Sequence, residues 1–261
     1  MTFEDRVIVT PIARIRYWEQ GSGEPLLLLH SNGMSRHQFR ETMTHLSQHY
    51  RCIAWDYPGH GDSEPLQRHL SVADYAQITI AVLDALKIEQ AHVCGASIGG
   101  LACIALAAAA PERVLALTIV ESVLRTPKEW EAEWPRIESS FAITHQIEAS
   151  VAPRFRQLTP ALLERWNIDR SKAGGWRMVD VMWAIRDYDA LADLHNVKNP
   201  CVVVFGDKGP AVVGMDRYTR AQPDAAIKVM RDAGHFPMVD DPAAFADAVH
   251  AGIVKVMTMG A

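Results

Sequence analysis

A serine between two glycines is the feature of this chain that most directly predicts chemistry. Gly95-Ala96-Ser97-Ile98-Gly99 follows the apolar run at 91–94 and precedes an alanine-rich segment, where a strand would give way to a helix. A serine on such a tight turn is lifted above the sheet edge, and the glycines let the strand and the helix pass close by. We therefore predict that Ser97 is a nucleophile. The N–H of Ile98, at the positive end of the helix, is placed to stabilise an oxyanion.

A serine hydroxyl is a weak nucleophile at neutral pH, so Ser97 needs a base and a carboxylate that orients the base. Asp232-Ala233-Gly234-His235-Phe236-Pro237 follows a strand-like run at 226–230 and precedes an apolar helix that runs from Pro242 to about Val256. A histidine in a loop after a strand reaches the carboxyl edge of an open α/β sheet, where such sheets bind ligands. His235 is the predicted general base.

The elements that would position these residues are visible as short apolar runs separated by longer amphipathic segments. Continuous apolar runs are typical of parallel strands that are covered on both faces. A segment at 13–18 alternates instead, which predicts an antiparallel edge strand. Helices are predicted at 71–86, with Ser71 and Asp74 as a capping box, and at 101–110, ended by Pro111. The apolar runs are residues 26–29, 52–55, 91–94, 114–120 and 201–205.

This alternation predicts a doubly wound, mostly parallel α/β sheet. From 124 to 196 the strand-like runs vanish and charged and aromatic residues recur at helical spacing, so we predict a helical cap inserted into a core formed by 1–123 and 197–261. Five of the seven tryptophans lie in this segment, which suggests a lid over an apolar pocket. They are Trp130, Trp134, Trp166, Trp176 and Trp183.

Composition excludes several other classes of function. A net charge of -5 with no lysine or arginine cluster argues against nucleic acid or an anionic membrane as a partner. The first thirty residues carry scattered charges, and no stretch of about 18 uncharged apolar residues exists, so we expect a cytoplasmic protein without a secretory signal. The four cysteines are widely spaced and the histidines show no metal-ligand pairing, so neither a metal nor a cofactor is expected.

Several motifs in order resemble the α/β-hydrolase fold family over nearly the whole chain. They are Leu29-His30-Ser31-Asn32-Gly33, Asp56-Tyr57-Pro58-Gly59-His60-Gly61-Asp62-Ser63, the Ser97 turn, Pro111-Glu112-Arg113-Val114 and Gly234-His235-Phe236. Capped esterases, enol-lactone hydrolases and carbon-carbon bond hydrolases look closest. The resemblance implies that Ser97 is the nucleophile, that His235 is the base and that the N–H groups of Ile98 and Asn32 form the oxyanion hole. Ser31 stands where the family usually has glycine.

The acid of the triad departs from the family pattern. The family usually places it three residues beyond a glycine after the strand that is here 201–205, and that position is Gly209. Asp207 lies nearby in the same turn. Glu121 follows the preceding strand at 114–120, a position that other family members use. Both carboxylates stay candidates, with Glu121 preferred because it can reach the Nδ1 of His235.

The predicted function is cofactor-free hydrolysis of a carboxylic ester or lactone with an apolar or aromatic group, by a monomer or homodimer. Hydrolysis of a carbon-carbon bond in a diketone from aromatic ring degradation is the alternative. A small-molecule receptor or a cofactor-free oxygenase on the same fold stays open as well. Ser31, Trp130, Trp134 and Trp183 are the expected substrate-binding residues. Cap arginines that would suit a substrate carboxylate are Arg125, Arg154, Arg177 and Arg186.

Overall fold

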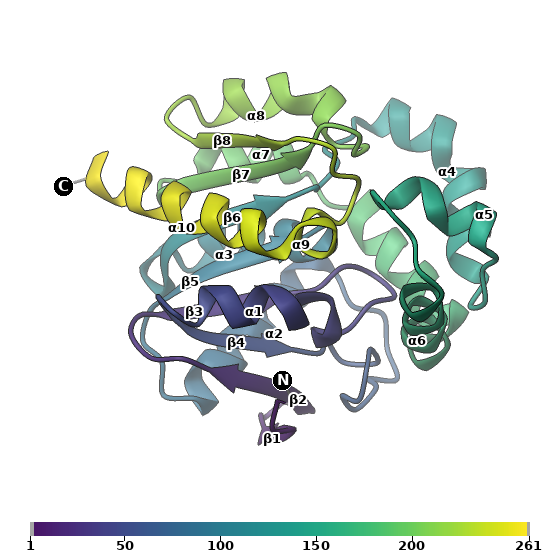
Figure 1. Cartoon of the computed structure of the whole chain (residues 1–261), viewed down its shortest axis with the longest axis horizontal. Helices are drawn as coiled ribbons and strands as arrows, with labels where there is room; N and C mark the ends of the chain where they lie inside the picture. Colours follow the sequence, from purple (N-terminus) through teal and green to yellow (C-terminus); the bar gives the residue numbers. More distant parts are fainter. Residues whose placement is uncertain (1–2, 260–261) are drawn as a thin grey trace.

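The central sheet has eight strands in the order β1-β2-β4-β3-β5-β6-β7-β8. The computed structural model describes residues 3–259 (Figure 1). β2 pairs antiparallel with both β1 and β4, and the other pairs are parallel, which confirms the mostly parallel sheet. The strands are β1 (Arg6–Val9), β2 (Arg14–Gln20), β3 (Pro25–Leu29), β4 (Arg51–Trp55), β5 (Ala91–Ala96), β6 (Val114–Val120), β7 (Cys201–Gly206) and β8 (Ala226–Met230).

The prediction of an edge strand at 13–18 was wrong in one respect. This segment forms β2, which lies between β1 and β4. The edge is β1, a strand of only four residues in which Val9 is exposed. So short a run, with a single fully buried side chain, carries too weak a periodic pattern to be recognised from sequence.

Helices cover both faces of the sheet. Leu26 and Leu28 point into a core with α1 and α10, whereas Leu27 and Leu29 point into a core with α2, α3 and α7. The predicted capping box of α2 is present, with Ser71 and Asp74 bonded to each other's backbone. These helices are α1 (Arg40–Leu46), α2 (Val72–Ala85), α3 (Ile98–Ala109), α7 (Ala190–Asn196), α8 (Met215–Ala221), α9 (Pro237–Asp240) and α10 (Pro242–Met259).

The segment between β6 and β7 is helical, and the last helix of the predicted cap at 124–196, α7, packs on α3 beside the sheet. It contains α4 (Pro127–Ala142), α5 (Glu148–Val151), α6 (Pro160–Arg186) and α7. Gly174 interrupts α6 with a φ of 76°, so α6 is two helices joined at a kink. Figure 1 shows α4, α5 and α6 together beyond the ends of the parallel strands, and we call these three helices the cap. Within residues 3–259, no helix is both long enough and apolar enough to cross a bilayer.

Candidate active site

Ser97 lies on the turn between β5 and α3 with a φ of 56° and a ψ of -115°. This is a strained conformation for a residue with a Cβ, and the surrounding contacts hold it in place. The backbone N–H of Ser97 donates to the carbonyl of Val120 at 2.9 Å, and Ser122 Oγ donates to the carbonyl of Ser97 at 2.7 Å. A Cβ at Gly99 would lie 2.2 Å from the carbonyl oxygen of Leu29, so only glycine allows α3 to approach β3 this closely.

His235 lies in the loop between β8 and α9. Its backbone N–H donates to the carbonyl of Arg154 at 2.9 Å, and the N–H of Gly234 donates to Asp240 Oδ2 at 2.7 Å. Arg154 lies in the connection between the cap helices α5 and α6, so this connection holds the histidine loop. The position of the imidazole therefore depends on the cap as well as on the sheet.

Glu121 is the carboxylate that reaches His235. Its Oε2 lies 3.3 Å from His235 Nδ1, and its side chain is fully buried. The residue has a φ of 47°, in the left-handed region, which turns the side chain back from the end of β6. Its two oxygens also accept hydrogen bonds from the backbone N–H groups of Gly206, at 2.9 Å, and Ala211, at 3.2 Å.

The glycine at 209 explains how this carboxylate fits. A Cβ on Gly209 would lie 2.2 Å from Glu121 Oε1, so the Glu121 carboxylate occupies the space that a side chain at 209 would need. Asp207, the other candidate, is exposed, and its backbone N–H donates to the carbonyl of Met230. Of the two candidate acids, Glu121 is the one that contacts the imidazole.

Ser97 and His235 line one cavity of about 170 Å³ between the sheet and the cap. It adjoins a hollow of about 310 Å³, with which it shares Arg125 and Trp130. Ligand sites usually enclose about 300–1,000 Å³, so the inner cavity is small and the adjoining hollow would have to hold any larger group. The apolar wall of the inner cavity comes from α3, α4 and α6 and consists of Leu101, Trp130, Ile137, Phe141, Met182 and Ile185.

The family model described as the alpha/beta hydrolase family matches residues 26–248. The chain belongs to the alpha/beta hydrolase family. It is 28% identical, over 87% of its length, to the dihydrolipoyllysine-residue acetyltransferase component of the acetoin cleaving system of Pseudomonas putida, and spans 63% of that protein. It is 24% identical to 3-oxoadipate enol-lactonase 2 of Acinetobacter baylyi over 95% of this chain and 96% of the relative. The solved enol-lactonase from Burkholderia xenovorans LB400 shares the fold, with a TM-score of 0.82 and 21% identity over 95% of this chain and all of that one.

In this alpha/beta hydrolase chain, two of the three tryptophans predicted to bind substrate lie elsewhere. Trp130 lines the cavity, whereas Trp134 and Trp183 pack on each other with ring centroids 4.3 Å apart. Trp183 is 38% exposed. The reason is helical phase: Met182 faces the cavity, and the next residue on α6 points about 100° away from it.

Ser31 and Asn32 are not among the residues that line this cavity, and the substrate-binding role of Ser31 stays a prediction. Ser31 Oγ donates to the carbonyl of Ala96 at 3.4 Å. The side chain of Asn32 donates to the carbonyl of Met178 at 2.8 Å, and its Oδ1 lies 3.3 Å from His60 Nε2, so it ties the oxyanion loop to α6. The roles of the Asn32 and Ile98 N–H groups stay predictions; that of Ile98 is the first of α3, where helical N–H groups have no intrahelical acceptor.

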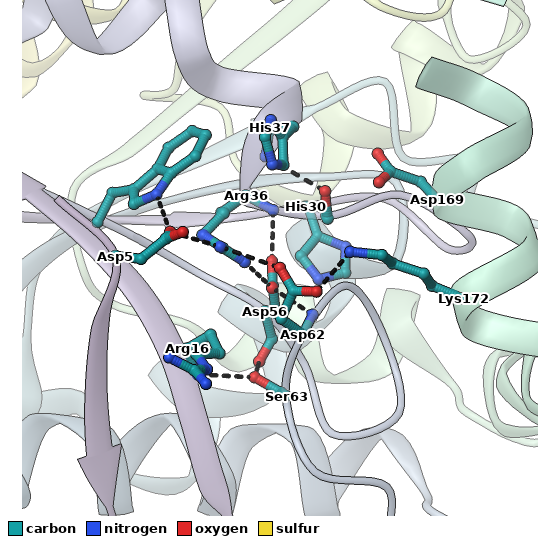
Figure 2. Close-up of polar contacts among 12 residues, drawn as sticks. Asp5, Arg16, His30, Arg36, His37, Asp56, Asp62, Ser63, Asp169 and Lys172 are labelled. Atoms are coloured by element: carbon teal, nitrogen blue, oxygen red, sulfur yellow. Dashed lines mark hydrogen bonds and ion pairs between the residues drawn. The ribbon is translucent and has the colours of Figure 1, made fainter. Parts of the chain in front are cut away.

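A buried ionic network anchors the loop after β3 (residues 30–35). Arg36, 1% exposed, forms ion pairs with Asp5, Asp56 and Asp62. Figure 2 shows Arg36 among these three carboxylates, with Lys172 reaching Asp62 from α6. Burial raises the pKa of Asp56, and Arg36 opposes that rise. Nearby, burial lowers the pKa of His30 to about 4, and His30 accepts the backbone N–H of Tyr57, so His30 is a neutral support for the loop.

Three arginines line the cavity beside Ser97: Arg125, Arg136 and Arg154. Sequence reasoning singled out Arg125 and Arg154 but missed Arg136, which lies on the same face of α4 as Ser140. Of the other arginines considered, Arg177 is paired with Asp180 at 2.6 Å, and Arg186 lines the adjoining hollow. Within residues 3–259, no group of three or more histidine, cysteine, aspartate or glutamate side chains is arranged to hold a metal ion.

Proposed function

We propose that this chain is a serine hydrolase that cleaves a carboxylic ester or lactone through an acyl-enzyme on Ser97. The observation that carries the proposal is that Ser97 and His235 share a cavity while His235 Nδ1 lies 3.3 Å from the buried Glu121 carboxylate. A nucleophile, a base and a group that orients the base are the three parts this chemistry needs.

In the first half of the reaction, Ser97 Oγ attacks the carbonyl carbon while His235 takes the serine proton. Negative charge develops on the carbonyl oxygen, and the N–H groups of Ile98 and Asn32 stabilise it. Glu121 holds the imidazole with Nδ1 protonated and stabilises the imidazolium that forms. The carbon-oxygen bond to the leaving alcohol then breaks, and His235 returns the proton to that oxygen.

In the second half, a water molecule attacks the acyl carbon on Ser97. His235 takes one proton from the water, and the tetrahedral intermediate collapses with transfer of that proton to Ser97 Oγ. The carboxylic acid leaves and the serine is restored. For a lactone, both product groups stay in one molecule, because the bond that breaks in the first half is within the ring.

Two further observations support an ester or lactone substrate. The relative named 3-oxoadipate enol-lactonase 2 matches over 95% of this chain, so its reaction class is the natural proposal for the same fold and site. The walls of the small cavity are mostly apolar, with Trp130 among them, which suits a small-molecule substrate. Faster turnover of a ring-cleavage diketone than of every ester and lactone in a panel would contradict the proposal and favour carbon-carbon bond hydrolysis.

The test of the acid compares Glu121→Gln with Asp207→Asn on p-nitrophenyl butyrate. Glu121→Gln should lower kcat by roughly 10³–10⁴-fold, because the neutral amide no longer fixes the productive tautomer of His235. Asp207→Asn is the matched control and should stay within about twofold of the parent, since its side chain is exposed. Circular dichroism checks that both variants fold. Full activity in Glu121→Gln would remove Glu121 from the mechanism.

A further inference from the structure

The cavity that holds Ser97 is strongly cationic. Arg125, Arg136 and Arg154 line it, and no aspartate or glutamate is among the described residues that line it. Glu121 lies behind His235, fully buried and bonded to backbone N–H groups. Outside the wall, Glu133 pairs with Arg136 and, together with Glu129, acts on Arg125 from beyond direct contact.

Arg125 and Arg154 are held in place without being neutralised. The guanidinium of Arg154 lies over the ring of Trp166 at 5.5 Å, and that of Arg125 lies over the ring of Trp130 at 4.8 Å. Among residues 3–259, neither guanidinium makes a hydrogen bond or an ion pair. Burial lowers the pKa of both groups, so each charge has lost part of its hydration.

Arg170 is a neighbouring arginine on α6 whose guanidinium has a structural role, and it serves as a comparison. Arg170 lies over the rings of Phe141 and Trp166, but its Nη2 also donates to the carbonyls of Ser140, at 2.9 Å, and Ile143, at 2.6 Å. These bonds hold the end of α4 on α6. Arg154 and Arg125 have the ring contact alone, so their donors are free for a molecule in the cavity.

Arg136 differs from Arg125 and Arg154 because it is paired and exposed. It pairs with Glu133 at 2.5 Å, and its side chain is 68% exposed. Because Glu133 balances its charge and water screens the pair, Arg136 adds little to the potential in the cavity, which comes from Arg125 and Arg154 instead.

We propose that the substrate of this site is an ester or lactone that carries a free carboxylate, and that Arg154 and Arg125 bind this carboxylate while Ser97 attacks the ester carbonyl. This inference rests on the proposed hydrolase function and names its substrate class. A planar guanidinium offers paired donors that match the two carboxylate oxygens. The tryptophan rings fix the two guanidinium groups before the substrate arrives, which reduces the entropy lost on binding.

The experiment compares two p-nitrophenyl esters whose far carboxyl group is free in one and methylated in the other, p-nitrophenyl hydrogen adipate and p-nitrophenyl methyl adipate. The parent protein should hydrolyse the charged ester with a kcat/KM about 10–100-fold above that of the neutral ester, the range that one or two hydrogen bonds to a charged group provide. Arg154→Met and Arg125→Met should each lower this ratio by roughly tenfold. Arg220→Met, an exposed arginine of α8 paired with Asp216, is the matched control and should leave both rates unchanged.

Two results would overturn the inference. One is a ratio at or below one in the parent protein, which needs no variant and so is immune to a folding defect. The other is a ratio that neither methionine variant changes. Failure of the hydrolase proposal looks different: neither ester is cleaved. Calorimetric titration with disodium adipate then still tests whether the two arginines bind a carboxylate. Saturable binding to the parent protein that is weaker in Arg154→Met and Arg125→Met supports such a site. No binding to the parent protein contradicts it.

Discussion

Two regions of this molecule that contain buried or partly buried arginines differ in how their charges are balanced. At the end of the loop after β3, Arg36 is fully buried and pairs with three carboxylates, those of Asp5, Asp56 and Asp62. On the cap side of the cavity, the guanidinium groups of Arg125 and Arg154 are partly desolvated and lie over tryptophan rings, and among residues 3–259 they form no ion pair. In the first region carboxylates contact the cation directly. In the second, no carboxylate of residues 3–259 contacts either guanidinium, and Glu133 and Glu129 act on Arg125 only from beyond direct contact.

This difference in pairing distinguishes a charge that stabilises the fold from a charge that is available to bind a ligand. A buried ion that is paired and hydrogen-bonded fixes the positions of the loops that supply its partners, as Arg36 does for the loops after β3 and β4. A desolvated ion without a partner costs free energy in the empty protein and recovers it when an anion binds. The degree of pairing therefore predicts which substitutions harm folding and which harm substrate selection.

Arg36→Met tests the paired region and should have the largest effect on stability. The buried Asp56 carboxylate would lose its charged partner, and breaking one side of a buried ion pair costs about 3–5 kcal/mol. Urea unfolding followed by circular dichroism measures the change. Arg154→Met is the comparison variant and should shift the free energy of unfolding by less than about 1 kcal/mol, since no ion pair is broken. Equal losses in the two variants would abolish the distinction between the regions.

Asp169 on α6 is an intermediate case, because it is a buried carboxylate with a partly exposed partner, Arg165. Burial raises the pKa of Asp169 from an ordinary value of 3.8 to about 6. The folded state therefore holds the proton more tightly than the unfolded state, and the stability contribution of this group falls as the pH rises from about 4 to 6.

Asp169→Asn removes this titration. Over that pH range the parent protein should lose roughly 2–3 kcal/mol relative to the variant, because one pKa unit corresponds to about 1.4 kcal/mol. Urea unfolding at pH 4 and pH 6.5 measures the difference. A gap between the two proteins that does not change with pH would show that Asp169 is ionised throughout and belongs with the fully paired groups.

Lys172→Met should have the smallest effect. Lys172 joins α6 to Asp62 of the Arg36 network, but its side chain is 40% exposed and water screens the pair. We expect a loss of at most about 1 kcal/mol, decreasing with added salt. A larger, salt-independent loss in thermal unfolding would mean that the ionic network extends into the cap.

The sequence was enough to predict the parts of this architecture that depend on local pattern. The five apolar runs form strands β3 to β7 and the strand-like run at 226–230 forms β8, and the glycine-flanked Ser97 is on a strained turn between β5 and α3. The choice between Glu121 and Asp207 could not be made in the same way, because it depends on the space left at Gly209 by a loop 88 residues away from Glu121.

Other features depend on three-dimensional relationships that no local pattern carries. Trp183 and Met182 are neighbours in sequence, but only one of them faces the cavity, and the phase of α6 decides which. The Arg36 network joins residues from the amino terminus, two loops and the cap. That no carboxylate of residues 3–259 pairs with the guanidinium of Arg154 follows only from the three-dimensional neighbours of this side chain.

The central claim is that Ser97 is a nucleophile activated by His235. Intact mass spectrometry after treatment with a fluorophosphonate tests it most directly, because attack by the serine oxygen displaces fluoride and leaves one phosphonyl group on the protein. We predict a single adduct that maps to Ser97, is absent in Ser97→Ala and forms far more slowly in His235→Ala. A folded parent protein that stays unlabelled, or that carries the adduct on another residue, would contradict the account.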